Sequence, residues 1–238
     1  MKKKERLDAL LKGDPTDRVI HYPFLLGFCG INVGYPIKTI YSDPEKSFLS
    51  QYWTHLQYDF DWGPVYGYAS YGTWEFGGKI KMPESIYEQA PVQLDFPVQS
   101  EDDIDRLVFP DVKKAGSLPL AMEFAKYQEQ YGTPVTPVMP GVFTLAGNLC
   151  SANKLCRWMI KKPELVHQIL QISADHLVSV IKHWSNIFGG SKVIPQLWEP
   201  LASNEVISPK QFEEFILQYM YEICEAILEL GIKHIFFH

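Results

Sequence analysis

The sequence predicts an α/β fold in which parallel strands alternate with amphipathic helices, and the last part of the chain carries the clearest signal. An apolar run at Ser191–Leu197 and a second at Ile232–His238 predict two buried strands. Between them, apolar residues recur at helical spacing, and Ser208 with Gln211 has the pattern of a capping box. Two parallel strands joined by one helix make a right-handed βαβ unit.

The rest of the chain is predicted to follow the same alternation. Strands are expected near residues 20, 60 and 136, before those near 194 and 235. Residues 66–98 are expected to form a loop and a β-hairpin inserted after the second strand, with hairpin strands at Trp74–Met82 and Ala90–Leu94. Loops are expected at Gly27–Tyr41 and Gly141–Leu149. The expected helices are Lys3–Lys12, Ser42–Gln57, Ser100–Leu107, Leu118–Tyr131, Asn153–Ile160, Pro163–Phe188 and one from Ser208 to Leu230.

Composition narrows the class of protein. The 238 residues are 46% apolar, which is enough for one sizeable domain spanning residues 1–238. A net charge of −6 argues against nucleic acid as a partner. No apolar run approaches the ~20 residues of a membrane span, so no membrane partner is expected. Four cysteines without a repeated spacing indicate reduced thiols and a cytoplasmic location.

Polar residues at predicted strand ends are the candidates for chemistry, because folds of repeated βα units place their sites there. Asp61 lies near the end of the second strand, Glu199 follows the fourth and His238 ends the fifth. Each also has a structural interpretation. Asp61 could be a loop or cap partner, Glu199 a salt-bridge partner at the sheet edge, and His238 a histidine of the core. Because parallel strands end on one side, we expect the three residues to converge.

Several segments together resemble a known superfamily. They are RLDALLKGDPTDRVIHYPF, GVFTLAGNL, KKPELVHQIL, WEPLASNEVISPKQFEEF and LGIKHIFFH. They resemble the uroporphyrinogen decarboxylase superfamily, and within it the corrinoid-dependent (methylcobamide) methyltransferases more closely than the decarboxylase. The resemblance implies a (β/α)₈ TIM barrel of which about the first five βα units are present. A buried strand left as a bare edge is an aggregation hazard, so we expect a barrel truncated at its C-terminus or completed by another chain.

The same resemblance implies an activity. Such enzymes move a methyl group between a corrinoid (cobalamin) on a partner protein and a small-molecule donor or a thiol acceptor, with assistance from zinc. His238 matches the first zinc ligand of the family, whose other ligands are cysteines. Cys29, Cys150, Cys156 and Cys224 match neither of them.

The resemblance also suggests roles for the other candidates. Asp61 resembles the catalytic aspartate of the decarboxylases in position, and Glu199 would orient the substrate or bind the metal. Tyr22 and Trp198 belong to an aromatic set that would line a pocket for the methyl donor, although ordinary core and hairpin packing is the favoured explanation for any single member. Asn148 stands where the decarboxylase has a tyrosine and is the third candidate for substrate binding.

Two alternatives remain. The first is uroporphyrinogen decarboxylase, which must bind a tetrapyrrole with many carboxylates. The stretch Phe24–Tyr35 contains no Arg or Lys that could bind those carboxylates. The chain could instead be a non-catalytic half-barrel that binds a corrinoid protein.

Overall fold

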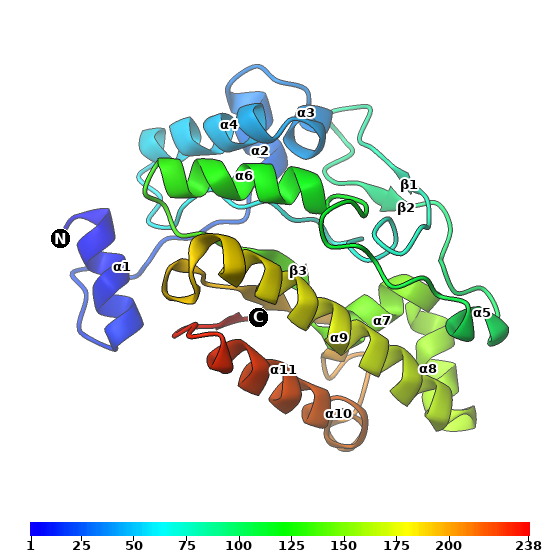
Figure 1. Cartoon of the computed structure of the whole chain (residues 1–238). Helices are drawn as coiled ribbons and strands as arrows, with labels where there is room; N and C mark the ends of the chain where they lie inside the picture. The colour runs from blue at the N-terminus through cyan, green and yellow to red at the C-terminus, as the bar shows by residue number, and fades with distance from the viewer.

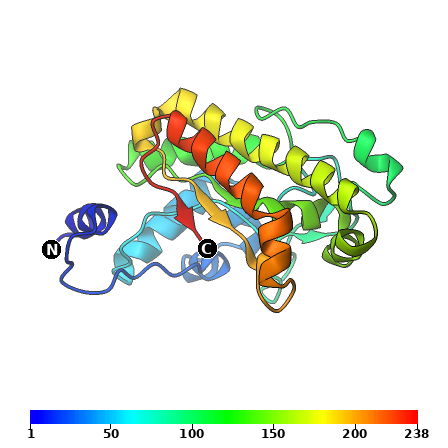
Figure 2. The ribbon, with the colours of Figure 1, turned by 90° about the horizontal axis from the view of Figure 1, so that it is seen from below.

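The computed structural model describes residues 1–238, and its centre is an open parallel sheet (Figure 1). Its strands β3 (Val138–Pro140), β4 (Gln196–Trp198) and β5 (Phe236–Phe237) follow one another in that order. The long helices α9 (Pro163–Phe188) and α11 (Leu217–Glu229) lie side by side along the sheet (Figure 2). The predicted α/β class and the parallel strands near 136, 194 and 235 are therefore confirmed. The sheet is small and does not close into a barrel.

The remaining elements surround this centre. The helix α1 (Lys3–Lys12) lies apart from the main body in Figure 1, and α4 packs on α6. No helix is both long and apolar enough to cross a lipid bilayer. The other elements are α2 (Leu26–Asn32), α3 (Ile37–Ser42), α4 (Pro44–Gln57), β1 (Ile80–Lys81), β2 (Val92–Gln93), α5 (Asp102–Asp105), α6 (Leu118–Gln130), α7 (Val142–Cys150), α8 (Ala152–Lys161), α10 (Pro209–Phe215) and 3₁₀ turns at Gly190–Lys192 and Pro200–Ala202.

The strands predicted near residues 20 and 60 were wrong. Both segments are irregular, and the second makes only an isolated parallel bridge, between Tyr66 and Pro137. The backbone N–H of Asp61 donates to the carbonyl of His21 (2.9 Å), but the N–H of His21 donates to the Asp61 carboxylate (2.8 Å). A side chain thus replaces the backbone acceptor that a ladder would use. Pro23 and Pro64 also lack the N–H that a ladder needs.

Two predicted loops are helical. The stretch Gly27–Tyr41 contains α2 and α3, and Gly141–Leu149 is almost entirely α7. Both contain glycines and few polar residues, so neither shows a solvent-facing stripe that would indicate a helix. α7 is buried along its whole length, so its mostly apolar sequence has no charged, solvent-facing side that would have marked it as a helix.

The helix predicted after Ser208 begins as expected, with a capping box between Ser208 and Gln211. It is interrupted at Ile216, so α10 and α11 are separate. Gly231, which follows α11, adopts a positive φ of 76°, the left-handed conformation that glycine favours. The turn lets the chain reverse into β5.

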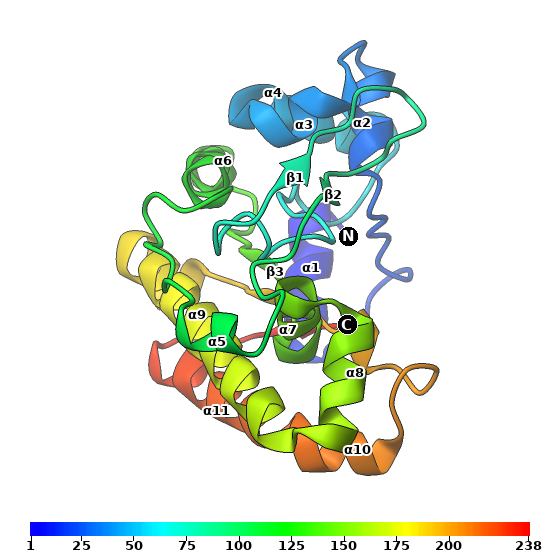
Figure 3. The same cartoon turned by 90° about the vertical axis from the view of Figure 1, so that its right-hand side faces the viewer.

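The predicted hairpin exists but is short. β1 and β2 pair antiparallel, with Ile80 opposite Gln93, and lie between the α2–α4 helices and α7 (Figure 3). The surrounding segment is tied down by side chains rather than by strands. The buried carboxylate of Glu75, for example, accepts hydrogen bonds from the Tyr68 hydroxyl (2.8 Å) and the Ser117 hydroxyl (2.7 Å).

Candidate functional site

The carboxyl ends of the parallel strands meet at one edge of the sheet. Gly141 follows β3, Glu199 follows β4 and His238 follows β5. The backbone N–H of Gly141 donates to the carbonyl of Trp198 (2.5 Å), and that of Glu199 donates to the carbonyl of His238 (2.8 Å). The structure therefore brings Glu199 and His238 together, as the sequence predicted for these two residues.

The Glu199 carboxylate is buried against the start of α7. It accepts hydrogen bonds from the backbone N–H groups of Phe143 (2.9 Å) and Thr144 (2.6 Å), and from the Thr144 hydroxyl (2.5 Å). The first N–H groups of a helix have no partner within the helix, and the positive end of the helix dipole favours an anion. Glu199 thus accepts hydrogen bonds from the free N–H groups at the start of α7, as a capping side chain would, although it follows β4.

Gly141 is required for this contact. A Cβ atom at position 141 would lie 2.2 Å from Oε2 of Glu199. Only glycine lets the carboxylate come so close to the backbone at the end of β3.

Glu199 has no salt-bridge partner. Its side chain is almost fully buried, and burial raises the pKa of Glu199 to about 7, although the hydrogen bonds from Thr144 and Phe143 oppose the shift. A carboxyl group with this pKa can release or accept a proton near neutral pH.

A small pocket of about 130 Å³ opens beside this carboxyl group. Phe24, Tyr68, Met139 and Trp198 are among its mostly apolar walls, and Thr144 supplies a hydroxyl. Thr144 therefore lies between the pocket, which it lines, and Glu199, to which its hydroxyl donates.

Trp198 connects the pocket to the other predicted residues. Its ring lies 4.6 Å from the ring of Phe24 and 5.2 Å from that of His238, measured between centroids. Its indole N–H donates to Oε1 of Gln196 (3.2 Å), which also accepts from the Tyr22 hydroxyl (3.1 Å). Gln196 is fully buried. It is a single polar residue within an apolar strand, so the sequence did not indicate that it binds Trp198 and Tyr22.

Two predicted residues have other partners. The Asn148 amide donates to the backbone carbonyls of Ala69 and Tyr71, both at 2.8 Å, so it anchors the inserted segment on α7. Asn148 is not among the residues that line the pocket at the strand ends.

Asp61 lies at the opposite edge of the sheet. It precedes Tyr66, which already pairs with Pro137 at the start of β3, so Asp61 does not converge with Glu199. Its side chain is fully buried and forms salt bridges with Arg6 (2.6 Å) and Arg18 (2.8 Å). The expectation of three converging residues is therefore wrong for Asp61.

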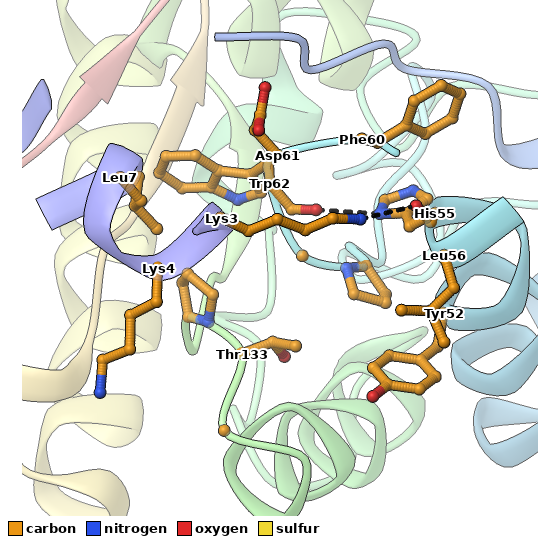
Figure 4. A pocket seen from close by; sticks show the side chains of 14 residues that line it. Lys3, Lys4, Leu7, Tyr52, His55, Leu56, Phe60, Asp61, Trp62 and Thr133 are labelled. Carbon is orange, nitrogen blue, oxygen red and sulfur yellow. Dashed lines mark hydrogen bonds between the residues drawn. The ribbon is translucent and has the colours of Figure 1, made fainter. Parts of the chain in front are cut away.

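A second hollow, of about 160 Å³, marks that opposite edge (Figure 4). Figure 4 shows Lys3, Lys4 and Leu7 of α1 on one side of it, and Tyr52, His55 and Leu56 of α4 on the other. The Lys3 ammonium donates to the carbonyl of His55 (3.0 Å), and Nδ1 of His55 lies 2.9 Å from the carbonyl of Trp62. These groups are used to hold α1 and α4 on the loop that carries Asp61.

The donor set does not fit a complete metal site. No group of three or more His, Cys, Asp or Glu side chains is arranged to hold a metal ion. His238 provides one imidazole, the Glu199 carboxylate is used by α7, and catalytic zinc needs three protein ligands. All four cysteines are free, and burial raises the pKa of Cys150 to about 12, so its thiol is held neutral in the core.

The chain is an α/β protein of parallel βα units, with a buried carboxyl group and a small apolar pocket at the carboxyl ends of the strands, where βα-barrel folds place their sites. The family model described as uroporphyrinogen decarboxylase (URO-D) matches residues 2–238, and the chain belongs to this family. The superfamily resemblance stated from the sequence is thereby confirmed.

Relatives and a solved structure agree with this assignment. The methylcobamide:CoM methyltransferase MtaA of Methanosarcina barkeri (strain Fusaro) is 28% identical over 162 residues, which is 67% of this chain and 44% of that protein. The uroporphyrinogen decarboxylase of Chlorobaculum tepidum is 26% identical over 156 residues, 61% of this chain and 42% of that protein. The chain thus matches less than half the length of these curated relatives. The structure of a methyltransferase from Methanosarcina mazei superposes with a TM-score of 0.80 at 22% identity, covering 95% of this chain and 67% of that one, and shows that the fold is shared.

Proposed function

We propose that this protein takes part in methyl transfer between a corrinoid and a small molecule, either a thiol acceptor or a methyl donor. The proposal is supported by curated relatives that match this chain and whose names describe methyl transfer of this kind. The observation that carries it is the buried, hydrogen-bonded pair of Glu199 and Thr144 beside an apolar pocket of about 130 Å³. A thiol must lose its proton when it accepts a methyl group, so such a site needs a nearby base.

The residues of the chain would act as follows. The sulfur of a thiol in the pocket forms a bond to the methyl carbon as the carbon–cobalt bond breaks, and the bonding electron pair stays on cobalt. The thiol proton passes to the Thr144 oxygen while the Thr144 proton passes to Glu199. Trp198 and Phe24 exclude water from the pocket, and Gln196 fixes the Trp198 indole and the Tyr22 hydroxyl. A pKa near 7 lets Glu199 also return the proton in the reverse direction.

We assign no step to zinc, because the donors within these 238 residues do not make a complete zinc site. His238 stays a candidate ligand, and the zinc content of the protein measures this directly. If His238 binds zinc, the protein should contain the metal and His238→Ala should lower the content. Equal zinc content and equal activity in both forms would show that His238 is not a zinc ligand and only packs against Trp198.

The assay for the proposed function is demethylation of methylcobalamin by a simple thiol, followed by absorbance. We expect wild-type protein to accelerate the reaction and Glu199→Gln to slow it by roughly 100-fold, the usual range for loss of a general base. An unchanged rate in the variant would remove Glu199 from the mechanism.

Decarboxylation of uroporphyrinogen is the competing activity. The stretch Phe24–Tyr35, now seen as α2 and its flanks, has no cationic side chain to hold the substrate carboxylates. We therefore expect no coproporphyrinogen to form. Its formation would replace methyl transfer with decarboxylation as the function. We also propose a cytoplasmic location, because all four cysteines are free.

A further inference from the structure

The helix α2 exposes two of its three large apolar side chains, Phe28 and Ile31, and buries the third, Leu26. Gly27, Cys29 and Gly30 are buried as well, whereas Leu25, just before the helix, is exposed and continues the outward face of Phe28 and Ile31 at a spacing of three residues. Leu25 is 43% exposed, Phe28 39% and Ile31 44%. A surface helix normally buries its apolar side chains and exposes its polar ones, so the exposure of Phe28 and Ile31 departs from the usual pattern.

The inward face of α2 cannot take larger residues. A Cβ at Gly27 would lie 2.3 Å from Oε1 of Gln89, and one at Gly30 would lie 3.1 Å from Cγ1 of Ile40. Close packing on Gln89 of the inserted segment and on Ile40 of α3 thus leaves little room for larger side chains at Gly27 and Gly30. Such a departure from the usual pattern is most often found where a protein meets another molecule.

The exposed apolar surface is wider than α2. The ring of Tyr58, itself 45% exposed, lies 5.7 Å from the ring of Phe28 and extends the surface onto the end of α4. From Tyr22 to Ile37 the sequence contains no Asp, Glu, Lys, Arg or His. Depletion of charge is the compositional mark of an interface core. We call the exposed residues Phe24, Leu25, Phe28, Ile31 and Tyr58 the α2 surface.

The α2 surface is continuous with the candidate site. Phe24 is 40% exposed, and it also lines the pocket at the strand ends, where its ring contacts Trp198. A partner seated on the α2 surface would therefore reach the mouth of that pocket. Contiguous exposed apolar residues beside a functional site mark binding surfaces in general.

The size of the pocket identifies the kind of partner. A corrin ring with its side chains is several times larger than a volume of about 130 Å³, so only the methyl end of such a molecule can enter. The ring must stay outside, held by whatever presents it. We propose that the α2 surface is the docking site for the protein that carries the corrinoid. This inference rests on the methyl transfer proposed above, and adds which face of the molecule the carrier uses.

The test separates docking from chemistry. Phe28→Glu places a charge in the middle of the α2 surface, and Ile31→Glu is a second variant in case the first does not fold. Leu228→Glu on α11, where Leu228 is 55% exposed, is the matched control. Circular dichroism and thermal melts establish that each variant is folded. Binding to a purified corrinoid protein loaded with methylcobalamin is then measured, together with methyl transfer from that carrier and from free methylcobalamin.

We expect Phe28→Glu and Ile31→Glu to weaken binding to the carrier by at least roughly tenfold, the effect of losing a central interface residue. Transfer from free methylcobalamin should be unchanged, and Leu228→Glu should behave as wild type. Equal carrier binding by all four proteins would overturn the inference. So would a wild-type homodimer that Phe28→Glu dissociates while carrier binding is kept, because the occupant would then be a second copy. If wild type transfers no methyl group but the α2 variants still lose carrier binding, the docking surface stands and the proposed function fails.

Discussion

Asp61 and Glu199 are both buried carboxylates, and the difference between their partners separates a structural site from a chemical one. Asp61 is enclosed by the guanidinium groups of Arg6 and Arg18 at the amino ends of the strands. Glu199 faces only backbone N–H groups and a hydroxyl at the carboxyl ends. Burial is similar, with 6% of Asp61 and 7% of Glu199 exposed. The two residues therefore differ in the charge of their neighbours and not in depth, and it is the uncompensated burial of Glu199 that raises its pKa to about 7.

The largest effect on stability is expected when Asp61 is replaced. Asp61→Ala leaves the nearly buried Arg6 guanidinium without its buried counter-ion, which should lower the free energy of unfolding by about 3–5 kcal/mol. Urea denaturation measures this. The activity of the protein that remains folded should not change, because Asp61 lies at the edge away from the pocket.

Asp17 provides the control for that variant. It also pairs with Arg6 (2.7 Å), but 40% of its side chain is exposed. Asp17→Ala should therefore cost much less than Asp61→Ala. Equal decreases in the free energy of unfolding would mean that the burial of Asp61 does not strengthen its contribution to stability.

The Glu199 side predicts a dependence on pH. Because the pKa of Glu199 rises on folding from 4.5 to about 7, the folded protein holds a proton that the unfolded chain has released between these values. The free energy of unfolding should then fall as pH rises from about 5 to about 8, by on the order of 3 kcal/mol from this group. Glu199→Gln cannot titrate, so its unfolding free energy should lack this component.

The measurement is the difference between the two stability curves over that pH range. Glu205→Gln, which removes a carboxylate from an exposed turn, controls for the change in net charge. Parallel curves for wild type and Glu199→Gln would show that Glu199 does not titrate in this range.

The same two residues show what the sequence could and could not predict. Glu199 follows an apolar run directly, so its place at a strand end was readable from the local pattern. Asp61 lies within Tyr58–Val65, which the sequence predicted as a strand, but its position along the sheet depends on the pairing of Tyr66 with Pro137. That register is set by contacts between distant parts of the chain, as are the salt bridges to Arg6 and Arg18. Strand patterns indicate which residues are buried, and only the pairing shows at which edge they lie.

Helices show a similar limit. α1, α4, α6 and α9 have polar and apolar faces, and their predicted bounds were close to the observed ones. α7 is wholly buried, and α2 exposes two of its large apolar side chains, so neither has the charged outer face that marks a surface helix in a sequence. Thr144 and Gln196 were missed for the related reason that single polar residues within apolar segments carry no periodic signal. Both belong to the site, and a buried polar residue in an apolar run is the signal that would have found them.

Thr144→Val tests the comparison with the smallest change. It removes the hydroxyl group that donates to Glu199 and keeps the shape of the side chain, so the free energy of unfolding should fall by about 1 kcal/mol. The Thr144 hydroxyl lowers the pKa of Glu199, hence its loss should raise that pKa further above 7 and move the pH midpoint of the stability difference upward. Thr144→Ser keeps the hydroxyl and should leave the midpoint in place. Since Thr144 also lies between Glu199 and the pocket, the valine variant should slow methyl transfer even at a pH where Glu199 is ionised, and the serine variant should not. A valine variant with the wild-type midpoint and rate would mean that Glu199 acts on the pocket by another path, and the contrast with Asp61 would then rest on stability alone.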